Sequence, residues 1–290
     1  MDYRILGQLE VIDAGTRIDL GYRQQRELLA LFLLERNHVV STDRILEVLW
    51  PENPAGKERT LWVYISRLRS ILEPGREART RSHVLVTCEH GYSLAIEPVD
   101  IDAGRFERLV HAGGSLVEVD PQRASALLRD GLALWRGSVL EGFEYEDFSQ
   151  AEGARLEELR LVALEDQIDA DIRSMRHREM LGNLEKLTRE HPHRERLVAL
   201  QMIALYRSGR QADALRAFAH YRRLLGEEFG IEPSPDLRRV EEQVLAHDVR
   251  LSTGPRAPDA NGPEPRLQPG AKCARRDAFS SVSWPRWHHQ

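Results

Sequence analysis

Residues 57–81 contain the side chains best suited to bind an anionic polymer. Seven residues in this stretch are basic and three are acidic, which gives a local charge of +4 in a chain whose net charge is −5. The basic residues are Lys57, Arg59, Arg67, Arg69, Arg76, Arg79 and Arg81. Arginine offers a planar fork of donors that fits a guanine edge or a phosphate. This island therefore predicts contact with DNA.

A helix over about residues 57–72 would place part of this island on one face. At about 100° per residue, the apolar Leu61, Ile65, Leu68 and Leu72 fall within about 60° of one another and form the packing side. The opposite side carries Arg59, Val63, Ser66, Arg67 and Ser70, with Thr60 and Trp62 beside it. Hydroxyls add short hydrogen bonds, and Val63 offers contact to a thymine methyl. We expect this face to read a major groove.

The remaining basic residues are better suited to the DNA backbone. Phosphate contacts give affinity and position without sequence information. We expect Lys57, Arg69, Arg76, Arg79 and Arg81 to contact phosphates. A hairpin tip carrying His90, Gly91 and Tyr92 would reach a neighbouring groove or backbone.

The elements around this helix fit a winged helix-turn-helix. Apolar and polar residues alternate from Tyr3 to Leu20, which predicts short antiparallel strands. Helical periodicity follows from Arg23 to Arg36, where Asn37 closes the helix. A short helix then opens at the N-cap cluster Ser41-Thr42-Asp43 and is stopped by Trp50-Pro51. After the third helix, residues 84–87 and 92–96 predict a hairpin with a turn at 89–91.

The rest of the chain predicts an all-helical domain and a tail. Residues 101–251 have strong helical periodicity. A shift of about 34 residues, the period of tetratricopeptide (TPR) helix pairs, superposes Leu184 on Phe218 and Leu187 on Tyr221. We therefore expect a mainly α protein with a small β component: residues 1–97 as a winged helix, 98–251 as a TPR-like all-α domain, and 252–290 as a disordered tail.

Composition excludes several classes of protein. No apolar run approaches the roughly 18–20 residues that span a bilayer, and the start of the chain lacks the pattern of a signal peptide. We expect a cytoplasmic protein with no membrane partner. Two cysteines, Cys88 and Cys273, cannot form a disulfide framework.

The sequence gives little support for a catalytic site or for binding of a metal or cofactor. The chain has no phosphate-loop, dinucleotide-binding, zinc-protease or nucleophile-elbow motif. Cys88 with His90, and His191 with His193, could each give two metal ligands, but zinc normally needs four. We expect no enzyme activity, no cofactor and no metal.

Two functions from different classes stay open at this point. An arginine-bearing amphipathic helix is often only a solvated helix, and a winged helix with TPR-like repeats could act as a protein-interaction scaffold. The winged-helix context, with the basic island on the third helix and the approach to the hairpin, favours DNA binding.

The chain resembles a known family at these same residues. Residues 1–97 are similar to the OmpR/PhoB-type winged-helix domain, and residues 98–250 are similar to the bacterial transcriptional activation domain. The first similarity rests on Leu28-Leu29-Ala30-Leu31, Leu49-Trp50, Ile65-Ser66-Arg67-Leu68-Arg69 and Gly91-Tyr92. The second rests on Asp102-Ala103-Gly104-Arg105-Phe106-Glu107, Leu134-Trp135-Arg136-Gly137, His191-Pro192-His193-Arg194 and Ala204-Leu205-Tyr206-Arg207-Ser208-Gly209.

In this order the two parts resemble the Streptomyces antibiotic regulatory protein (SARP) family. The resemblance implies a transcriptional activator, often of a secondary-metabolite gene cluster. It further implies binding to direct repeats of double-stranded DNA near promoters, as a homodimer or tandem protomers, and recruitment of RNA polymerase with its sigma factor. We expect no receiver domain ahead of the winged helix, so control by aspartyl phosphorylation is not implied.

Two positions depart from the pattern of the family. Cys88 replaces the usual basic residue of the hairpin, and Glu89 follows near its tip, where an acid would repel phosphate. Met175-Arg176-His177 stands where the first helical repeat normally turns on glycine, so a looser or differently shaped turn is expected there.

Overall fold

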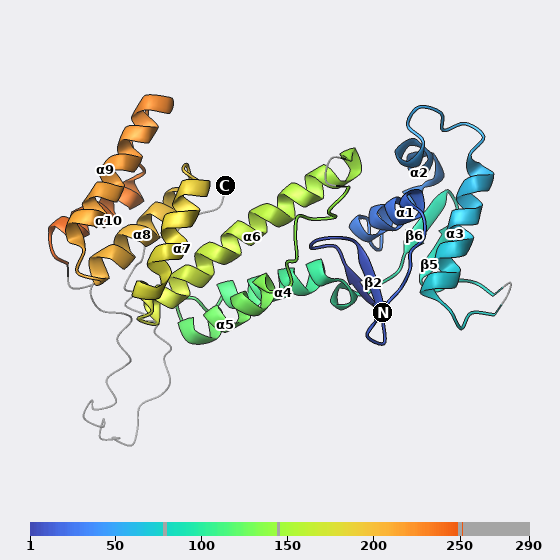
Figure 1. Cartoon of the computed structure of the whole chain (residues 1–290), viewed down its shortest axis with the longest axis horizontal. Coiled ribbons are helices and arrows are strands. Elements are labelled where there is room, and N and C mark those ends of the chain that lie inside the picture. Colours follow the sequence, from blue (N-terminus) through green and yellow to red (C-terminus); the bar gives the residue numbers. More distant parts are fainter. Residues whose placement is uncertain (78–79, 144–145, 249–250, 252–290) are drawn as a thin grey trace, which may run out of the picture. The chain divides into compact units, whose positions relative to one another are not determined.

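The computed structural model describes residues 1–77, 80–143, 146–248 and 251 (Figure 1). The chain divides into two compact units, Met1–Gln167 and Ile168–Gln290. The predicted class, mainly α with a small β component, is confirmed. The predicted tail, residues 252–290, lies outside the described residues.

The first unit contains two small antiparallel sheets. Their strands follow the orders β1-β2-β3 and β4-β6-β5. The strands are β1 (Asp2–Arg4), β2 (Glu10–Asp13), β3 (Thr16–Arg17), β4 (Val40–Ser41), β5 (Leu85–Cys88) and β6 (Gly91–Leu94). In the second sheet β6 is central, with Val40 opposite Tyr92 on one side and Thr87 opposite Tyr92 on the other.

Six α-helices begin among the described residues of the first unit. They are α1 (Arg23–Leu34), α2 (Thr42–Leu49), α3 (Glu58–Leu72), α4 (Asp102–Gly114), α5 (Pro121–Leu132) and α6 (Asp147–Arg173). A 3-10 turn, η1 (Pro98–Asp100), precedes α4. Residues 168–173, the C-terminal end of α6, belong to the second unit.

The three N-terminal helices and the second sheet form the expected winged helix. Residues 28–33 of α1 are all buried, so α1 is the central helix of this core. The Ser41 hydroxyl caps α2 by accepting from the Arg44 backbone N–H at 3.1 Å. Asn37 closes the segment after α1 in the left-handed region, with φ 64°. In Figure 1, α3 lies beside the β5–β6 hairpin.

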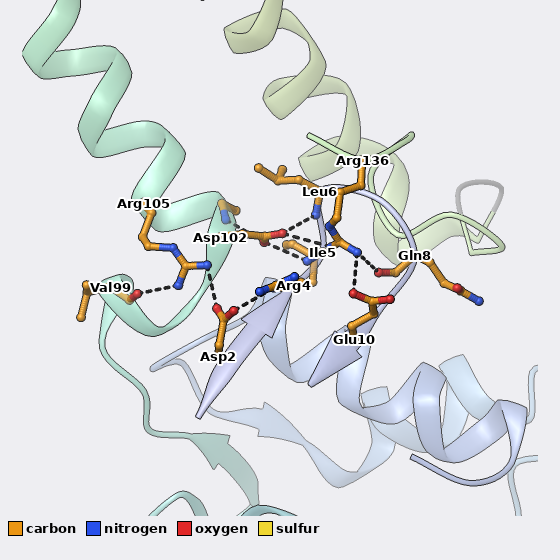
Figure 2. Close-up of polar contacts among 11 residues, drawn as sticks. Asp2, Arg4, Ile5, Leu6, Gln8, Glu10, Val99, Asp102, Arg105 and Arg136 are labelled. Carbon is orange, nitrogen blue, oxygen red and sulfur yellow. Dashed lines mark hydrogen bonds and ion pairs between the residues drawn. The ribbon is translucent and has the colours of Figure 1, made fainter. Parts of the chain in front are cut away.

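A polar junction joins the N-terminal strands to α4 within the first unit (Figure 2). Asp102, 2% exposed, accepts the backbone N–H groups of Ile5 and Leu6 at 2.8 and 3.1 Å. The Arg136 guanidinium donates to Asp102 at 3.3 Å and to Glu10 at 2.9 Å. The compact unit therefore continues past residue 97, where the sequence suggested a domain boundary, because Ile5, Leu6 and Glu10 of the N-terminal segment are hydrogen-bonded to Asp102 and Arg136.

The described residues of the second unit form helix pairs. It contains α7 (His177–Glu190), α8 (Glu195–Arg207), α9 (Gln211–Glu228) and α10 (Pro235–Leu245). Helices α7 and α9 begin one repeat apart, as the sequence predicts, and Leu184 and Phe218 are buried at equivalent positions. Met175 has φ 65°, and Gly209, at the equivalent turn of the next repeat, has φ 77°. The expectation of a differently shaped first turn was wrong, because methionine adopts the left-handed conformation that glycine has in the second.

Candidate nucleic-acid interface

Helix α3 presents the predicted reading face to solvent. Leu61, Ile65, Leu68 and Leu72 are buried, which fixes the orientation of the helix on the core. The opposite face carries the exposed residues Arg59, Trp62, Val63, Ser66, Arg67 and Ser70, and Thr60 is half-buried beside it. All seven residues predicted to read bases are thus brought together on one side of one helix. Ser70 Oγ donates to the Ser66 carbonyl oxygen at 3.1 Å, so it can still accept a hydrogen bond from a ligand.

The two arginines of this face have no partner within the described part of the chain. Neither Arg59 nor Arg67 forms an ion pair or side-chain hydrogen bond there. The side chains of Lys57 and Arg81 are equally without an ion pair among the described residues. An unpaired cation can bind a phosphate or base edge without first losing an internal contact. The face is therefore cationic and available.

Arg69, predicted to contact phosphate, is hydrogen-bonded to the hairpin. Its Nε donates to the Leu85 carbonyl oxygen at 2.9 Å, its Nη2 donates to Thr87 Oγ1 at 2.7 Å, and its guanidinium lies over the Tyr92 ring. Burial lowers the pKa of Arg69 from its ordinary value. The side chain joins α3 to the hairpin, so its main role is to position these elements.

The segment between α3 and β5 is anchored by Glu73. This carboxylate accepts from the Ser82 hydroxyl and from the backbone N–H groups of His83 and Val84. Burial opposes ionisation, but these hydrogen bonds hold the pKa of Glu73 below its ordinary value. Arg76 donates to the Thr80 carbonyl oxygen at 2.7 Å, and its Nε lies 3.8 Å from Glu73 Oε2. Arg76 therefore stabilises the same segment. Arg79, predicted to contact phosphate, lies outside the described residues.

The hairpin tip differs from the prediction at two residues. Gly91 and Tyr92 are buried in β6 and are not presented to a ligand. A Cβ on Gly91 would lie 2.0 Å from the Val40 carbonyl oxygen, so glycine is required for β4 and β6 to approach. The tip itself is formed by Glu89 and His90. Both are exposed, and His90 Nε2 lies 3.9 Å from Glu89 Oε1. Only His90 of the three predicted tip residues reaches solvent.

Sequence reasoning missed the contacts that position α3. Tyr64 stacks on Trp50 with ring centroids 5.9 Å apart, and its hydroxyl donates to Gln24 of α1 at 2.8 Å. These contacts tie α3 to α1 and to the segment after α2. Trp50 was recognised as the end of the second helix and as part of a family motif, without a partner, and Tyr64 falls between the apolar and polar faces, so neither signalled this contact.

Other types of site find no support in the described residues. They contain no group of three histidine, cysteine or acidic side chains that could hold a metal. No helix among them has the length and apolar character needed to cross a membrane.

Comparisons with known proteins match both parts of the chain. Residues 15–94 match the model of the transcriptional regulatory protein C-terminal family, and residues 101–245 match the bacterial transcriptional activator domain. The regulatory protein AfsR of Streptomyces coelicolor is 36% identical over 86% of this chain, which spans 25% of AfsR. The regulatory protein DnrI of Streptomyces peucetius is 36% identical over 91% of this chain and 96% of DnrI.

A solved structure agrees with these matches. The structure of Mycobacterium tuberculosis EmbR in complex with a low-affinity phosphopeptide has a TM-score of 0.78 at 33% identity, and covers 85% of this chain and 65% of that one. The matched proteins are transcriptional regulators, in agreement with the prediction that the chain is not an enzyme. The chain therefore belongs to the Streptomyces antibiotic regulatory protein family of transcriptional activators.

Proposed function

We propose that this protein binds promoter DNA sequence-specifically through α3 and activates transcription there. The observation that carries the proposal is the exposed face of α3, on which Arg59 and Arg67 have no partner among the described residues while the opposite face is buried. Ser66 and Thr60 add hydrogen-bonding groups beside them. A helix of this kind fits the major groove, where arginine pairs with guanine O6 and N7.

The DNA backbone contacts in this proposal come from fewer residues than the sequence suggested. Lys57 and Arg81 are available to bind phosphate, and His90 is exposed at the wing tip. Arg69 and Arg76 are engaged in holding α3, the hairpin and the segment between them. So few phosphate contacts give weak binding by one winged helix, because each neutralised phosphate adds to affinity and to its dependence on salt. We therefore propose that protomers bind direct repeats in tandem or as a homodimer, because linked sites raise the effective concentration.

Activation would use the helical part of the chain. Residues 98–250 carry 22 basic and 29 acidic residues, a net charge of −7. We propose that this acidic segment contacts RNA polymerase with its sigma factor, and that the genes controlled include a secondary-metabolite cluster. Residues 1–97 would bind DNA and residues 98–251 would serve activation, although the first compact unit includes parts of both.

A mobility-shift assay with the full chain tests DNA binding. Wild-type protein is titrated against its own upstream DNA at several salt concentrations, with random duplex as competitor. We expect competitor-resistant bands that form in steps. Arg67→Ala should reduce binding to the specific DNA about tenfold or more while random duplex loses less, since a bidentate base contact contributes about 1–3 kcal/mol.

Arg108→Ala is the matched control, since Arg108 is exposed on α4 and its loss removes the same charge elsewhere in the first unit. It should leave the ratio of specific to random binding unchanged. If Arg67→Ala keeps the wild-type ratio, Arg67 does not read bases. If the wild type shows no competitor-resistant complex at low salt, the protein-interaction scaffold becomes the better explanation.

Transcription in vitro tests activation. Purified polymerase holoenzyme and a template with the bound repeats should give more transcript with wild-type protein than without it, and Arg67→Ala should abolish the increase. An increase that persists in Arg67→Ala would show that activation does not depend on base recognition by α3.

A further inference from the structure

A cavity of about 340 Å³ lies between the first sheet and the N-terminal end of α1. Three of the described residues that line it are apolar, Leu9, Ile18 and Leu20. Leu9 and Leu20 are buried and Ile18 is half-buried, so this part of the lining belongs to the core of the first unit. Sites for small molecules have volumes of roughly 300–1,000 Å³. A small organic molecule therefore fits this cavity.

The cavity is also lined by Arg26 of α1, a half-buried cation. The Nε atom of Arg26 is buried and has no hydrogen-bond partner. Within the part of the chain that the structure describes, the Arg26 side chain forms no ion pair and no hydrogen bond. A buried donor without an acceptor destabilises a fold, so it requires a specific explanation.

Two arginines near Arg26 have carboxylate partners. Arg17, which lines the same cavity, has its Nη1 3.1 Å from Glu10 Oε1. Arg23, one turn before Arg26 on α1, has its Nη2 2.7 Å from Glu146 Oε1. Arg26 is therefore the arginine of this region whose charge is left for an acceptor from outside the described residues. A ligand in the cavity would provide that acceptor.

The charges of the lining indicate which kind of ligand fits. Besides Arg17 and Arg26, the lining includes Asp19, whose Oδ1 accepts from the Gly21 backbone N–H at 2.9 Å. Because Arg17 is paired with Glu10, Arg26 alone offers a free positive charge, and Asp19 repels a second negative charge on a ligand. A monoanion is therefore favoured over a phosphate dianion. The planar guanidinium fork matches a carboxylate through two parallel hydrogen bonds.

We propose that this cavity binds a small organic carboxylate. The carboxylate group binds the Arg26 guanidinium, and the apolar part of the molecule contacts Leu9, Ile18 and Leu20. The site uses no residue of α3 or of the β5–β6 hairpin. Its occupancy therefore does not depend on the proposed recognition of DNA, and either of the two can be wrong without the other.

Isothermal titration calorimetry of the full chain with octanoate tests the proposal. Octan-1-ol and octylamine have the same hydrocarbon chain with a neutral or a cationic head group. We expect octanoate to bind at one site, at least about tenfold more tightly than either of them, because only octanoate makes a charge-assisted hydrogen bond to Arg26. Arg26→Gln should weaken binding of octanoate at least about tenfold. Asp19→Asn should tighten it about two- to fivefold, since a like charge is removed while the hydrogen bond to Gly21 can remain.

Two controls separate this binding from general damage and from binding elsewhere. Arg108→Gln removes the same charge at an exposed position on α4 and should leave the affinity for octanoate unchanged. Circular dichroism melting should show Arg26→Gln as stable as the wild type, because no hydrogen bond or ion pair within the described residues is lost. In the wild type, octanoate but not octylamine should slow hydrogen exchange in peptides that cover residues 9–26.

Several outcomes would overturn the proposal. Equal affinity for octanoate and octan-1-ol, or an affinity for octanoate that is unchanged in Arg26→Gln, would show that Arg26 binds no carboxylate. Slower exchange confined to segments outside residues 9–26 would place the binding elsewhere. The absence of both heat and protection at millimolar octanoate would show that the cavity does not bind a small carboxylate. Tighter binding in Asp19→Asn together with loss in Arg26→Gln would support the proposal, since general damage does not increase affinity.

Discussion

Glu27 lies on α1 and is buried, with a relative exposure of 8%. Burial raises its pKa to about 7, the charge of Glu146 adds to the rise, and Arg23 opposes it. A carboxyl group with a raised pKa in the folded state holds its proton more tightly there than in the unfolded chain. Its contribution to stability is therefore complete below the ordinary value of 4.5 and decreases as the pH rises towards 7.

Replacing Glu27 by glutamine should remove this dependence on pH. Glu27→Gln stays neutral, so its free energy of unfolding should exceed that of the wild type by a margin that grows by about 2 kcal/mol between about pH 5 and pH 8. Urea denaturation at the two pH values measures the margin. Glu47→Gln, at an exposed position on α2, is the control. A constant margin for Glu27→Gln would mean that Glu27 does not titrate in this range.

Met175 provides a second test at the scale of single residues. It is 56% exposed and adopts φ 65°, a conformation that favours glycine. Met175→Gly should raise the free energy of unfolding of the second unit by about 0.5–1 kcal/mol. Gly209→Ala, at the equivalent turn with φ 77°, should lower it by about 1 kcal/mol. Thermal melting of both variants measures these changes in stability. A loss of stability in Met175→Gly would show that the left-handed conformation of Met175 carries no strain that glycine relieves.

Among the elements, helix α3 and the β5–β6 hairpin are held together by polar contacts. Arg69 joins them through Leu85 and Thr87, and Glu73 fixes the segment between them through Ser82 and two backbone N–H groups. The direction of the hairpin tip relative to α3 is thereby set. The tip carries the exposed acid Glu89, which weakens any approach to phosphate.

Reversing the charge of Glu89 tests whether the tip approaches DNA. Glu89→Lys should tighten binding, and the slope of log affinity against log salt should become more negative by about 0.9 for one new phosphate contact. Mobility shifts over a range of salt concentrations measure both effects. Asp130→Lys makes the same charge change at an exposed position on α5. If both variants give the same slope, the hairpin tip is not at the DNA.

At the scale of the whole molecule, the winged helix is continuous with the start of the helical domain. Asp102 satisfies two backbone donors of the N-terminal segment, and Arg136 bridges Asp102 to Glu10. Burial raises the pKa of Asp102 while these donors oppose the rise. Arg105 adds an ion pair to Asp2 at 2.7 Å. The segment Met1–Gln167 therefore forms one compact unit, which ends within α6.

Loss of Asp102 should destabilise this whole unit. Asp102→Ala leaves the N–H groups of Ile5 and Leu6 buried without an acceptor, so the free energy of unfolding should fall by about 3 kcal/mol. Hydrogen exchange should accelerate in peptides from both the winged helix and α4, while α9 keeps its protection. Asp130→Ala, on the exposed side of α5, should change little. Acceleration confined to α4 would show that the winged helix folds independently of this junction.

The sequence alone determined the class of fold and the face of α3 that meets solvent. Leu61, Ile65, Leu68 and Leu72 repeat with the helical period, and burial of an apolar stripe leaves no other orientation for the polar side. The spacing of the repeat likewise predicted the distance along the chain between the equivalent helices α7 and α9, because each repeat contains the same helix pair. These features depend on residues close together along the chain.

Which basic residues remain available, and where the compact unit ends, depends on contacts between distant segments of the chain. Arg67 and Arg69 lie on the same predicted helix, and both were predicted to bind DNA. Only Arg69, however, donates to acceptors of the hairpin, which lie 16 residues or more further along the chain. Gly91 is fixed by the approach of β4, and Asp102 by backbone donors from the start of the chain. Such contacts depend on how distant segments pack, and neither composition nor periodicity specifies a partner that far away.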